Sequence, residues 1–512
     1  MPKAKPKKTT GGKTYAEKRS FDKTPEPEGA KSFSGNVDLA TATPGKKFMI
    51  HQHHARRLHY DLRLEFMNGK TPVLASWAVP KNLPKRAGKP HLAVHVEDHP
   101  FEYGTFSGTI PAGNYGAGEV RIFDEGTYEV LEQAPAKLTI RLHGNRQRGI
   151  WHLVHTSADE GKDDWLVFLK DSERPEQDPL PELVPMLATL EREAFTDDGW
   201  LFEPKWDGVR ALATCIDETL LVSRTRRNIT ATYPELGRLH DHLVALEAVV
   251  DGEIVAITGG RPSFERLQSR MNVQNPRDVA RLSKSIPVTY MVFDLLYLDG
   301  KSLLNEPVEK RKELLQEIVV PADFVQVSSY IVGEGEALFE AACEQNLEGI
   351  VGKKMGSHYR PGRRSRDWLK VKTTHEVDLV VGGWSKGEGA RSKSFGALLI
   401  GSYDDKGVLH YVGSVGTGFS DKTLGKIMPE LEARRIDECP FESDPTGKKS
   451  SAFGKPLRDP QWVTPELVAR VEFRELTSQL RLRAPSFKQL VTTGETCNLE
   501  ELKELAWGSD GR

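Results

Sequence analysis

Six short runs between residues 46 and 170 alternate apolar with polar side chains, and glycine and proline residues separate them. A period of two puts every second side chain on one face of a strand, whereas a helix would place apolar residues three or four apart. Short strands with turn residues between them predict a small β-barrel or sandwich. The runs are LHYDLRLEF, HLAVHVE, EVRIFDEGTYEV, KLTIRLHG, IWHLVHT and WLVFLK.

The rest of the chain divides at a proline-rich stretch. A length of 512 residues exceeds what one core can organise, so roughly three domains are expected. RPEQDPLPELVP is typical of a linker, and the region after it mixes strands with helices, as in PVEKRKELLQEIV. A strand-rich region follows and ends in the helical NLEELKEL. The prediction is a multidomain α+β protein with a flexible basic arm at 1–40, a small β-barrel domain at 41–173, a linker at 174–185, an α+β domain at 186–375 and a strand-rich domain at 376–512.

Composition narrows the class of protein. The 4 cysteines lie far apart without a CxxC pair, which argues against a zinc ribbon or a disulfide framework and indicates a reducing cytoplasm. No apolar run reaches the roughly 18 residues of a membrane span, and the basic N-terminus lacks the apolar centre of a signal peptide. The net charge is −2, but basic clusters such as SRTRRN and YRPGRRSRDWLKVK favour nucleic acid as a partner.

One lysine is enclosed by an unusual set of neighbours in EPKWDGVR, where Lys205 stands between a proline and a tryptophan. VVDGEIVA puts Asp251 and Glu253 on one face of an apolar strand. DWLKVK aims Lys370 and Lys372 the same way, and like charges on one face indicate an anion, such as phosphate, between them. Taken singly, each segment would be an exposed strand edge with paired charges.

Taken together, the order KWDG, SR, DGE, FD, EGI and KxK over residues 200 to 375 resembles the covalent nucleotidyltransferases: DNA ligases, RNA ligases and capping enzymes. The resemblance implies that Lys205 attacks the α-phosphate of ATP, forming lysyl–AMP and releasing pyrophosphate. A free lysine is protonated near neutral pH, so we expect burial beside Trp206 and the two nearby lysines to disfavour its charged form. The resemblance also implies Mg²⁺ or Mn²⁺ at Glu253 and Glu348, and nucleotide or nick binding by Glu203, Arg210, Arg224, Glu253, Phe293, Lys370 and Lys372.

The C-terminal third of the sequence indicates which of these nucleotidyltransferases the chain resembles. RPGRRSRDWLKVK, KSFGALLIGSY and HYVGSVGTGF resemble the ATP-dependent DNA ligases, in which an OB-fold follows the catalytic core. The closing FRELTSQLRLRAPSF resembles that family's last motif, which implies that Arg481 and Arg483 assist pyrophosphate departure. Leu480 stands where this family usually has glycine, and Leu476 where tryptophan is common. The scattered cysteines exclude the zinc module of a NAD-dependent ligase.

Histidines concentrate in the first domain. His59 and Asp61 share one face of the strand LHYDLRLEF, and His53 lies six residues upstream on the incoming chain. Two imidazoles and a carboxylate suit an open site for a divalent transition metal, with positions left for water and phosphate. Exposed histidines on a strand are the alternative.

HHARRLHYDLRLE, SWAVPK and HVEDHPFEYGTFSGTIPAGNYGAG resemble the 3′-phosphoesterase domain of bacterial ligase D proteins, over residues 15 to 170. The resemblance implies that Mn²⁺, or another divalent transition metal, binds His53, His59 and Asp61. It further implies that Arg63, His99 and Tyr103 surround the scissile phosphate. KRSFDKTPEPEG resembles a functional arm in which Arg19 and Glu26 match and Ser20 replaces the usual aspartate. His54 is not an expected ligand.

The joint pattern predicts an ATP-dependent DNA ligase with a phosphoesterase, a nucleotidyltransferase and an OB-fold, which cleans and seals nicks and double-strand ends. The resemblance implies end joining with Ku at the bacterial nucleoid. A primase-like polymerase is not expected within the chain, and cooperation with a separately encoded one is left open. The alternatives are an RNA ligase or capping-type enzyme, and a DNA-end scaffold with an inactive phosphoesterase domain or ligase core.

Overall fold

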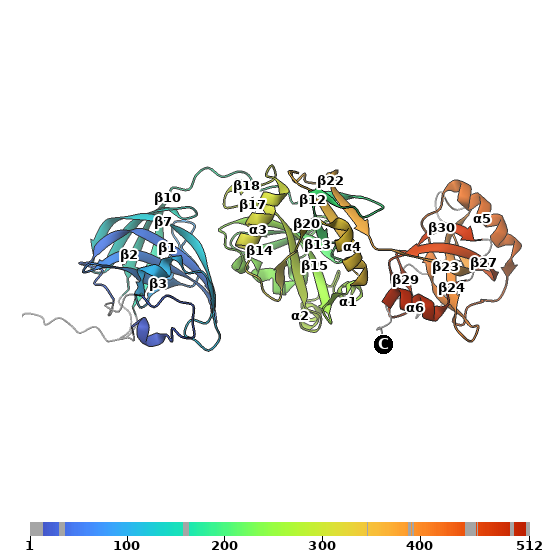
Figure 1. The fold of residues 1–512 in the computed structure, drawn as a ribbon, viewed down its shortest axis with the longest axis horizontal. Coiled ribbons are helices and arrows are strands. Elements are labelled where there is room, and N and C mark those ends of the chain that lie inside the picture. Colours follow the sequence, from blue (N-terminus) through green and yellow to red (C-terminus); the bar gives the residue numbers. More distant parts are fainter. Residues whose placement is uncertain are drawn as a thin grey trace, which may run out of the picture.

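The computed structural model describes residues 14–29, 36–156, 163–345, 347–387, 391, 394–445, 457, 459–491 and 496–507. Three β-rich bodies follow one another along the chain (Figure 1). Of the predicted basic arm, residues 1–13 and 30–35 lie outside the described residues. Over the part of the chain that is described, no helix is long and apolar enough to cross a membrane.

The first body is a closed β-barrel, as predicted. β7 pairs with β1 as well as with β8, and this pairing closes the ring. In spatial order the ring consists of β1 (Thr43–His54), β2 (Leu58–Asn68), β3 (Thr71–Val79), β4 (His91–His95), β10 (Asp164–Ser172), β9 (Arg148–His155), β8 (Lys137–Gly144) and β7 (Gly118–Ala134). Short elements complete this body: β5 (His99–Pro100), β6 (Gly108–Ile110), η1 (Ala16–Lys18) and η2 (Phe101–Thr105).

Apolar side chains from all eight ring strands form one core, for example Phe48, Leu62, Trp77 and Trp151. Two of the ring strands, β1 and β3, were not among the six predicted runs. β3 is buried on both faces over most of its length, so it reads as a continuous apolar stretch without alternation. In β1, lysines and histidines interrupt the apolar pattern.

The second body contains two sheets that face each other across a cleft. One consists of β11 (Leu187–Leu190), β22 (Arg364–Lys372), β21 (Gly349–Lys354), β12 (Asp197–Pro204) and β20 (Ile331–Gly333). The other consists of β14 (Thr219–Ser223), β13 (Val209–Cys215), β15 (Ala248–Thr258), β17 (Val288–Leu298) and β18 (Lys301–Ser302), with β16 (Arg261–Pro262) and β19 (Val325–Val327) at its margin.

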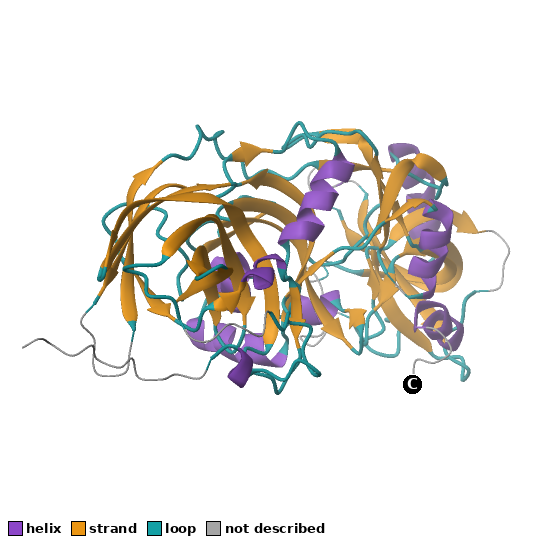
Figure 2. Cartoon of the chain, turned by 60° about the vertical axis from the view of Figure 1, so that its left-hand side comes forward, coloured by secondary structure: helices purple, strands orange, loops and turns teal. Residues whose placement is uncertain are grey.

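Helices cover the second body on the outside (Figure 2). They are α1 (Phe264–Gln268), α2 (Pro276–Ser285), α3 (Val308–Ile318) and α4 (Gly335–Glu344), with the short η3 (Thr230–Thr232) and η4 (Pro234–His242). α3 confirms the helix predicted from PVEKRKELLQEIV, because its Leu315 and Ile318 join the apolar core beneath it.

The third body is mainly antiparallel β-structure, in line with the expected OB-fold, although no pairing among the described strands closes it into a full ring. Its sheet runs β25 (Leu409–Val415), β24 (Phe395–Tyr403), β23 (His375–Lys386), β27 (Gln461–Phe473) and β26 (Arg435–Ile436), with β30 (Ser486–Val491) beside β27. A hairpin of β28 (Glu475–Leu476) and β29 (Leu482–Arg483) projects from it, and α5 (Asp421–Ala433) and α6 (Leu499–Trp507) complete the body. α6 confirms the predicted C-terminal helix.

The proline-rich segment after the barrel is attached to the second body. The Arg174 guanidinium lies 3.0 Å from the Glu247 carboxylate. The Asp178 amide donates to the carbonyl of Gly300 (2.8 Å), and the Asp178 carboxylate accepts from the amide of Ser302 (2.8 Å). The segment therefore connects the two bodies along a defined path.

The second body also covers one end of the barrel. Val244, Leu246 and Val320 belong to the same apolar cluster as the barrel interior. The Lys85 ammonium donates to the carbonyl of Leu246 (2.7 Å), and the Gln52 amide donates to that of Asp241 (2.7 Å). The two bodies thus share a packed interface as well as a connecting segment.

Candidate active sites

A cleft of about 190 Å³ lies between the two sheets of the second body. Strands from both sheets supply its walls, with Lys205 directly after β12 and Phe293 on β17. The Lys205 amide donates to the carbonyl of Gly349 (2.8 Å), which fixes the backbone that carries the side chain. The predicted residues that line the cleft are Glu203, Lys205, Arg210, Arg224, Glu253, Phe293 and Lys370.

The nearest partner of the Lys205 ammonium is a carboxylate. Lys205 forms an ion pair with Glu348, which also lies 3.4 Å from the Lys372 ammonium and 3.4 Å from the Arg474 guanidinium. We expected Trp206 and the two nearby lysines to disfavour the charged form of Lys205, and the carboxylate of Glu348 acts in the opposite direction because it compensates positive charge. Before Lys205 could attack a phosphate, this ion pair would have to open. A metal ion at Glu348 would share the carboxylate with three cationic partners.

The two predicted phosphate-binding lysines do lie beside Lys205. Burial lowers the pKa of Lys370, and the nearby charges of Lys372 and Lys205 lower it further. Three ammonium groups this close favour a bound polyanion, since an anion would relieve their repulsion.

Arg210 is held by a residue to which the sequence had assigned no role. Both oxygens of the buried Asp251 carboxylate accept from the Arg210 guanidinium, at 3.0 and 2.6 Å. The Tyr359 hydroxyl also donates to Asp251 (2.6 Å). A bidentate, buried pair of this kind fixes the orientation of the guanidinium. Its neighbour Glu253 lines the cleft, and burial raises the pKa of Glu253 to about 8 despite the opposing effect of Lys205.

Glu203 and Phe293 share a cation that sequence reasoning missed. The Lys353 ammonium lies 3.0 Å from a Glu203 oxygen, and the Lys312 ammonium lies 3.0 Å from the same oxygen. Lys353 is buried, lines the cleft, and lies 4.8 Å from the ring centroid of Phe293 and 4.4 Å from that of Trp368. The available signal was a lysine inside the apolar strand of LEGIVGKK, because such a lysine must be paired.

The third body contributes arginines to this site. The carboxylate of Asp207 lies 2.6 Å from the Arg474 guanidinium and 2.6 Å from that of Arg483. Arg483 also packs over the Phe264 ring, with its guanidinium carbon 3.8 Å from the ring centroid. Arg481 does not reach the lysine and instead donates to the carbonyl of Tyr411 within the third body. Arg474, in the quoted FRELTSQLRLRAPSF, was not predicted as a site residue.

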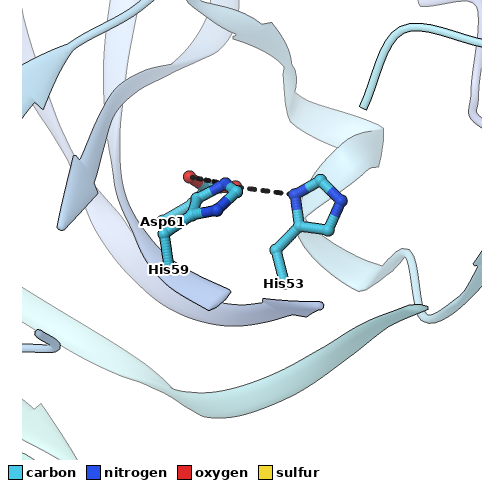
Figure 3. A group of neighbouring side chains, drawn as sticks. All are labelled: His53, His59 and Asp61. Carbon is cyan, nitrogen blue, oxygen red and sulfur yellow. Dashed lines mark ion pairs between the residues drawn. The ribbon is translucent and has the colours of Figure 1, made fainter. Parts of the chain in front are cut away.

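The barrel holds a second group of functional side chains on the outer face of β1 and β2 (Figure 3). The incoming chain that carries His53 is strand β1, and His53 lies directly opposite His59 in the antiparallel ladder. Asp61 Oδ2 lies 4.0 Å from His53 Nδ1, and Asp61 Oδ1 lies 3.6 Å from His59 Nε2. One ligand atom from each residue lies within 4.8 Å of the others.

Backbone carbonyls orient both imidazoles. His53 Nε2 is 2.7 Å from the carbonyl oxygen of Gly116, and His59 Nδ1 is 3.0 Å from that of Arg57. A carbonyl can only accept, so each of these nitrogens carries the proton, and the lone pairs of His53 Nδ1 and His59 Nε2 face Asp61. Two imidazoles oriented by backbone carbonyls, with a carboxylate beside them, fit a divalent transition metal that keeps open positions.

We call His53, His59 and Asp61 the metal group, and Arg63 lies buried beside it. Its guanidinium donates to Asp61 (2.8 Å), to His51 Nδ1 (3.1 Å) and to the Ser76 hydroxyl (2.9 Å). Burial by itself would raise the pKa of Asp61, but Arg63 and the histidines outweigh it and lower the pKa. Arg63 thus keeps Asp61 ionised, and the polar face of β2 is largely buried, unlike the exposed histidines of the alternative interpretation.

The predicted arm closes over the same face. The Arg19 guanidinium lies 2.8 Å from Glu26 and 3.2 Å from His99 Nε2. His99 Nδ1 donates to the carbonyl of Glu97 (2.9 Å), and the Tyr103 ring lies 4.7 Å from the His99 ring. His99 and Tyr103 are buried and belong to the layer beneath the arm.

Family comparisons agree with this division of the chain. The DNA Ligase D 3′-phosphoesterase domain matches residues 51–155. The ATP dependent DNA ligase domain matches residues 185–372, and the ATP dependent DNA ligase C terminal region matches residues 391–492. The fold and the lysine cleft thus define an ATP-dependent DNA ligase architecture with an appended phosphoesterase-type barrel.

The relatives of the chain show which kind of ATP-dependent DNA ligase it is similar to. The chain is 39% identical over 495 residues to the multifunctional non-homologous end joining protein LigD of Mycolicibacterium smegmatis, covering 93% of this chain and 59% of the relative. It is 31% identical over 518 residues to the LigD protein of Pseudomonas aeruginosa, covering 90% and 58%. The ligase domain structure from M. tuberculosis LigD is 33% identical and covers 60% of this chain and 95% of that one, with a TM-score of 0.35.

Over 93% of its length the chain is homologous to the LigD protein of M. smegmatis, and it carries the 3′-phosphoesterase, ATP-dependent ligase and ligase C-terminal domains. It spans about 59% of the length of the LigD relative from M. smegmatis.

Proposed function

We propose that the chain seals 3′-hydroxyl, 5′-phosphate breaks in DNA with ATP, through a lysyl–AMP intermediate at Lys205. The observation that carries this proposal is the convergence of the predicted motif residues on one cleft around that lysine. The Lys205 nitrogen attacks the α-phosphorus, a P–N bond forms, and the bond to the bridging oxygen breaks so that pyrophosphate leaves.

The surroundings of Lys205 suit this step. Lys370 and Lys372 would hold the phosphates, and Phe293 would stack on the base. Arg474 and Arg483 supply positive charge from the third body, close to where pyrophosphate would depart. Arg210 and Arg224 line the side of the cleft where the sugar and the nick end are expected. Mg²⁺ or Mn²⁺, held with Glu253 or Glu348, would offset the phosphate charge when bound.

The test is to incubate the full chain separately with labelled ATP and labelled GTP, and to map the labelled residue by mass spectrometry. We expect label from ATP on Lys205, and then transfer to a nicked DNA duplex but not to a nicked RNA duplex. Label from GTP, or sealing of RNA alone, would support a capping-type enzyme or an RNA ligase instead.

For the barrel, we propose a metal-dependent 3′-phosphoesterase and 3′-ribonuclease that leaves a 3′-hydroxyl end. His53, His59 and Asp61 would hold the metal, with Mn²⁺ as the proposed ion. When bound, that ion supplies an activated water and positive charge at the phosphate. Arg63 keeps Asp61 ionised, and His99, Tyr103 and Arg19 form the polar layer next to it.

This proposal is tested with an oligonucleotide that ends in a 3′-phosphate, after chelation and with Mn²⁺, Mg²⁺, Zn²⁺ or no metal restored. We expect inorganic phosphate release with Mn²⁺ and none without metal. Equal release from the chelated protein would reject the metal-dependent mechanism, and no release with any metal would leave the barrel as a DNA-binding module.

We further propose that the chain acts in double-strand break repair with Ku, because its LigD relatives are described as non-homologous end joining proteins. A separately encoded primase-like polymerase would cooperate. Joining of double-strand ends should rise when cognate Ku is added, whereas sealing of a nick should not change. An unchanged rate of end joining over a range of salt concentrations would reject the partnership.

A further inference from the structure

Among the large hydrophobic side chains that are exposed in the described part of the chain, one is aromatic. Tyr115 is 51% exposed, and the other members of that class are aliphatic. Single exposed apolar residues are common on proteins, so exposure alone carries no conclusion. The position of Tyr115 is informative, because the carbonyl of the next residue, Gly116, accepts a hydrogen bond from His53 of the metal group.

The loop that carries Tyr115, residues 111–117, is firmly folded between β6 and β7. The Ala117 amide donates to the carbonyl of Asn114 (3.2 Å). The Asn114 side-chain amide donates to the carbonyls of Pro111 (3.1 Å) and Lys23 (3.3 Å). Gly116 has a φ of 75°, and a Cβ added there would lie 3.5 Å from the His53 ring. The loop backbone thus lies against His53 while the Tyr115 ring stays exposed.

The arm places cations against this ring. The Lys18 ammonium lies 4.9 Å from the Tyr115 ring centroid, and the Arg19 guanidinium carbon lies 5.5 Å from it. Both cations are anchored by Glu97, at 2.8 Å for Lys18 and 3.3 Å for Arg19. Proteins bind single-stranded nucleic acids with this arrangement of an exposed aromatic ring and nearby cations. A base stacks on the ring, and the phosphate backbone lies near the cations.

We propose that Tyr115 is the stacking platform for the 3′-terminal nucleobase of a DNA strand whose end enters the barrel site. The inference rests on the proposed phosphoesterase function and specifies how that site takes its substrate. The metal group faces the terminal phosphate, and the adjacent loop receives the base attached to the same nucleotide. Stacking accepts every base because each has a flat face, so the platform serves ends of any sequence.

The first test is binding without added metal. A single strand with the fluorescent base 2-aminopurine at its 3′ terminus is titrated with the full chain, with Tyr115→Ala and with Tyr115→Phe. We expect quenching by the wild type and by Tyr115→Phe, and loss of quenching in Tyr115→Ala. The control is Leu131→Ala, because Leu131 is similarly exposed on β7 but far along the strand from the metal group.

The second test compares phosphate release from a strand with a normal terminal base and from one with an abasic terminal nucleotide. Tyr115→Ala should lower kcat/KM roughly tenfold on the first strand and leave the second unchanged, as loss of one stacked base predicts. Equal losses on both strands, or no loss on either, would overturn the platform. If the wild type released no phosphate, Tyr115-dependent quenching would still support the platform while the phosphoesterase proposal failed.

Discussion

The metal group of the barrel and the lysine cleft of the second body are built in different ways. The three metal-group residues come from one β-hairpin, and backbone carbonyls of the same body fix both imidazoles. The lysine cleft lies between two sheets, and its acidic residues Asp207 and Glu348 are paired with arginines from a third body. One site is complete within a single body, and the other is assembled from two.

This difference teaches where each site is sensitive to change. A site within one rigid sheet keeps its geometry as long as the sheet is folded. An assembled site depends on how its bodies dock, so a residue outside the cleft can control it. In the closed arrangement seen here, Arg474 bridges to Asp207 and Glu348, and Glu348 pairs with Lys205, the proposed nucleophile. Docking of the third body and the state of the lysine are therefore coupled.

The largest expected effect is a double dissociation between the two sites. Lys205→Ala should abolish self-adenylylation and nick sealing, by more than about a thousandfold, because no other nucleophile occupies its place. His59→Ala should abolish 3′-phosphate removal by a similar factor, because it removes a predicted metal ligand. Each variant should keep the other activity within about twofold.

Both activities are measured on the same preparations, with circular dichroism as the check of folding. Loss of end trimming in Lys205→Ala, or loss of sealing in His59→Ala, would show that the shared interface at Leu246 and Lys85 couples the two bodies catalytically.

A smaller effect tests the assembled nature of the lysine site. Arg474→Ala should slow self-adenylylation by about a hundredfold, because two charge-assisted contacts across the bodies are lost. Arg481→Ala is the matched control. Its rate of self-adenylylation should stay within about twofold of the wild-type rate, because Arg481 donates a hydrogen bond within the third body. Phosphate release by the barrel should not change in either variant. Equal losses in both arginine variants would contradict the arrangement described here.

The sequence allowed the barrel, the α3 and α6 helices and the cleft-lining motif residues to be predicted, because each depends on local periodicity or a local motif. The alternation of LHYDLRLEF, for example, gives β2. The pairings of Lys353 with Glu203 and of Arg474 with Asp207 could not be predicted, since they join residues far apart in the chain. No local pattern shows how separate bodies dock.

His53 illustrates the same limit inside one body. His51 and His53 of β1 lie on the opposite side of the strand from the core residues Phe48 and Ile50, and Lys46 and Lys47 precede them, so the apolar alternation is hard to recognise. The ladder that sets His53 opposite His59 is a tertiary feature of the hairpin. Composition could suggest a metal group, but the lone pairs that face Asp61 follow from the carbonyls of Gly116 and Arg57, which only the fold brings there.

A third prediction concerns the stability of the barrel against pH. Burial by itself would lower the pKa of His95, but a hydrogen bond with Asp163 (2.7 Å) and the carboxylate of Asp98, 3.7 Å away, outweigh it and raise the pKa to about 9. A raised pKa means that the folded barrel binds the proton more tightly than the unfolded chain does. The stabilisation is therefore complete below the ordinary histidine pKa of about 6.5 and is lost as the pH rises through about 9.

The shift corresponds to about 3 kcal/mol, and we expect about 2 kcal/mol because Asp163 is half exposed. Urea unfolding followed by tryptophan fluorescence reports it, since the Trp77 ring lies 5.0 Å from the His95 ring. The stability difference between wild type and His95→Gln should shrink by about that amount from about pH 6 to about pH 9.5. A constant difference would show that His95 is not protonated in the folded barrel.

The smallest expected effect concerns the turn that carries Arg483. Leu480 has a φ of 56°, the left-handed region in which glycine is favoured. Strain of about 1 kcal/mol is opposed by a similar gain from packing Leu480 partly against the third-body core. Leu480→Gly should therefore change the free energy of unfolding by less than about 1 kcal/mol.

The rate of adenylylation in Leu480→Gly should stay within about twofold of the wild-type rate. Backbone hydrogen bonds between Thr477 and Leu480 (2.9 Å) and between Thr477 and Arg481 (2.9 Å) hold the turn. A loss of adenylylation as large as that of Arg474→Ala would mean that the Leu480 side chain positions Arg483 against Asp207.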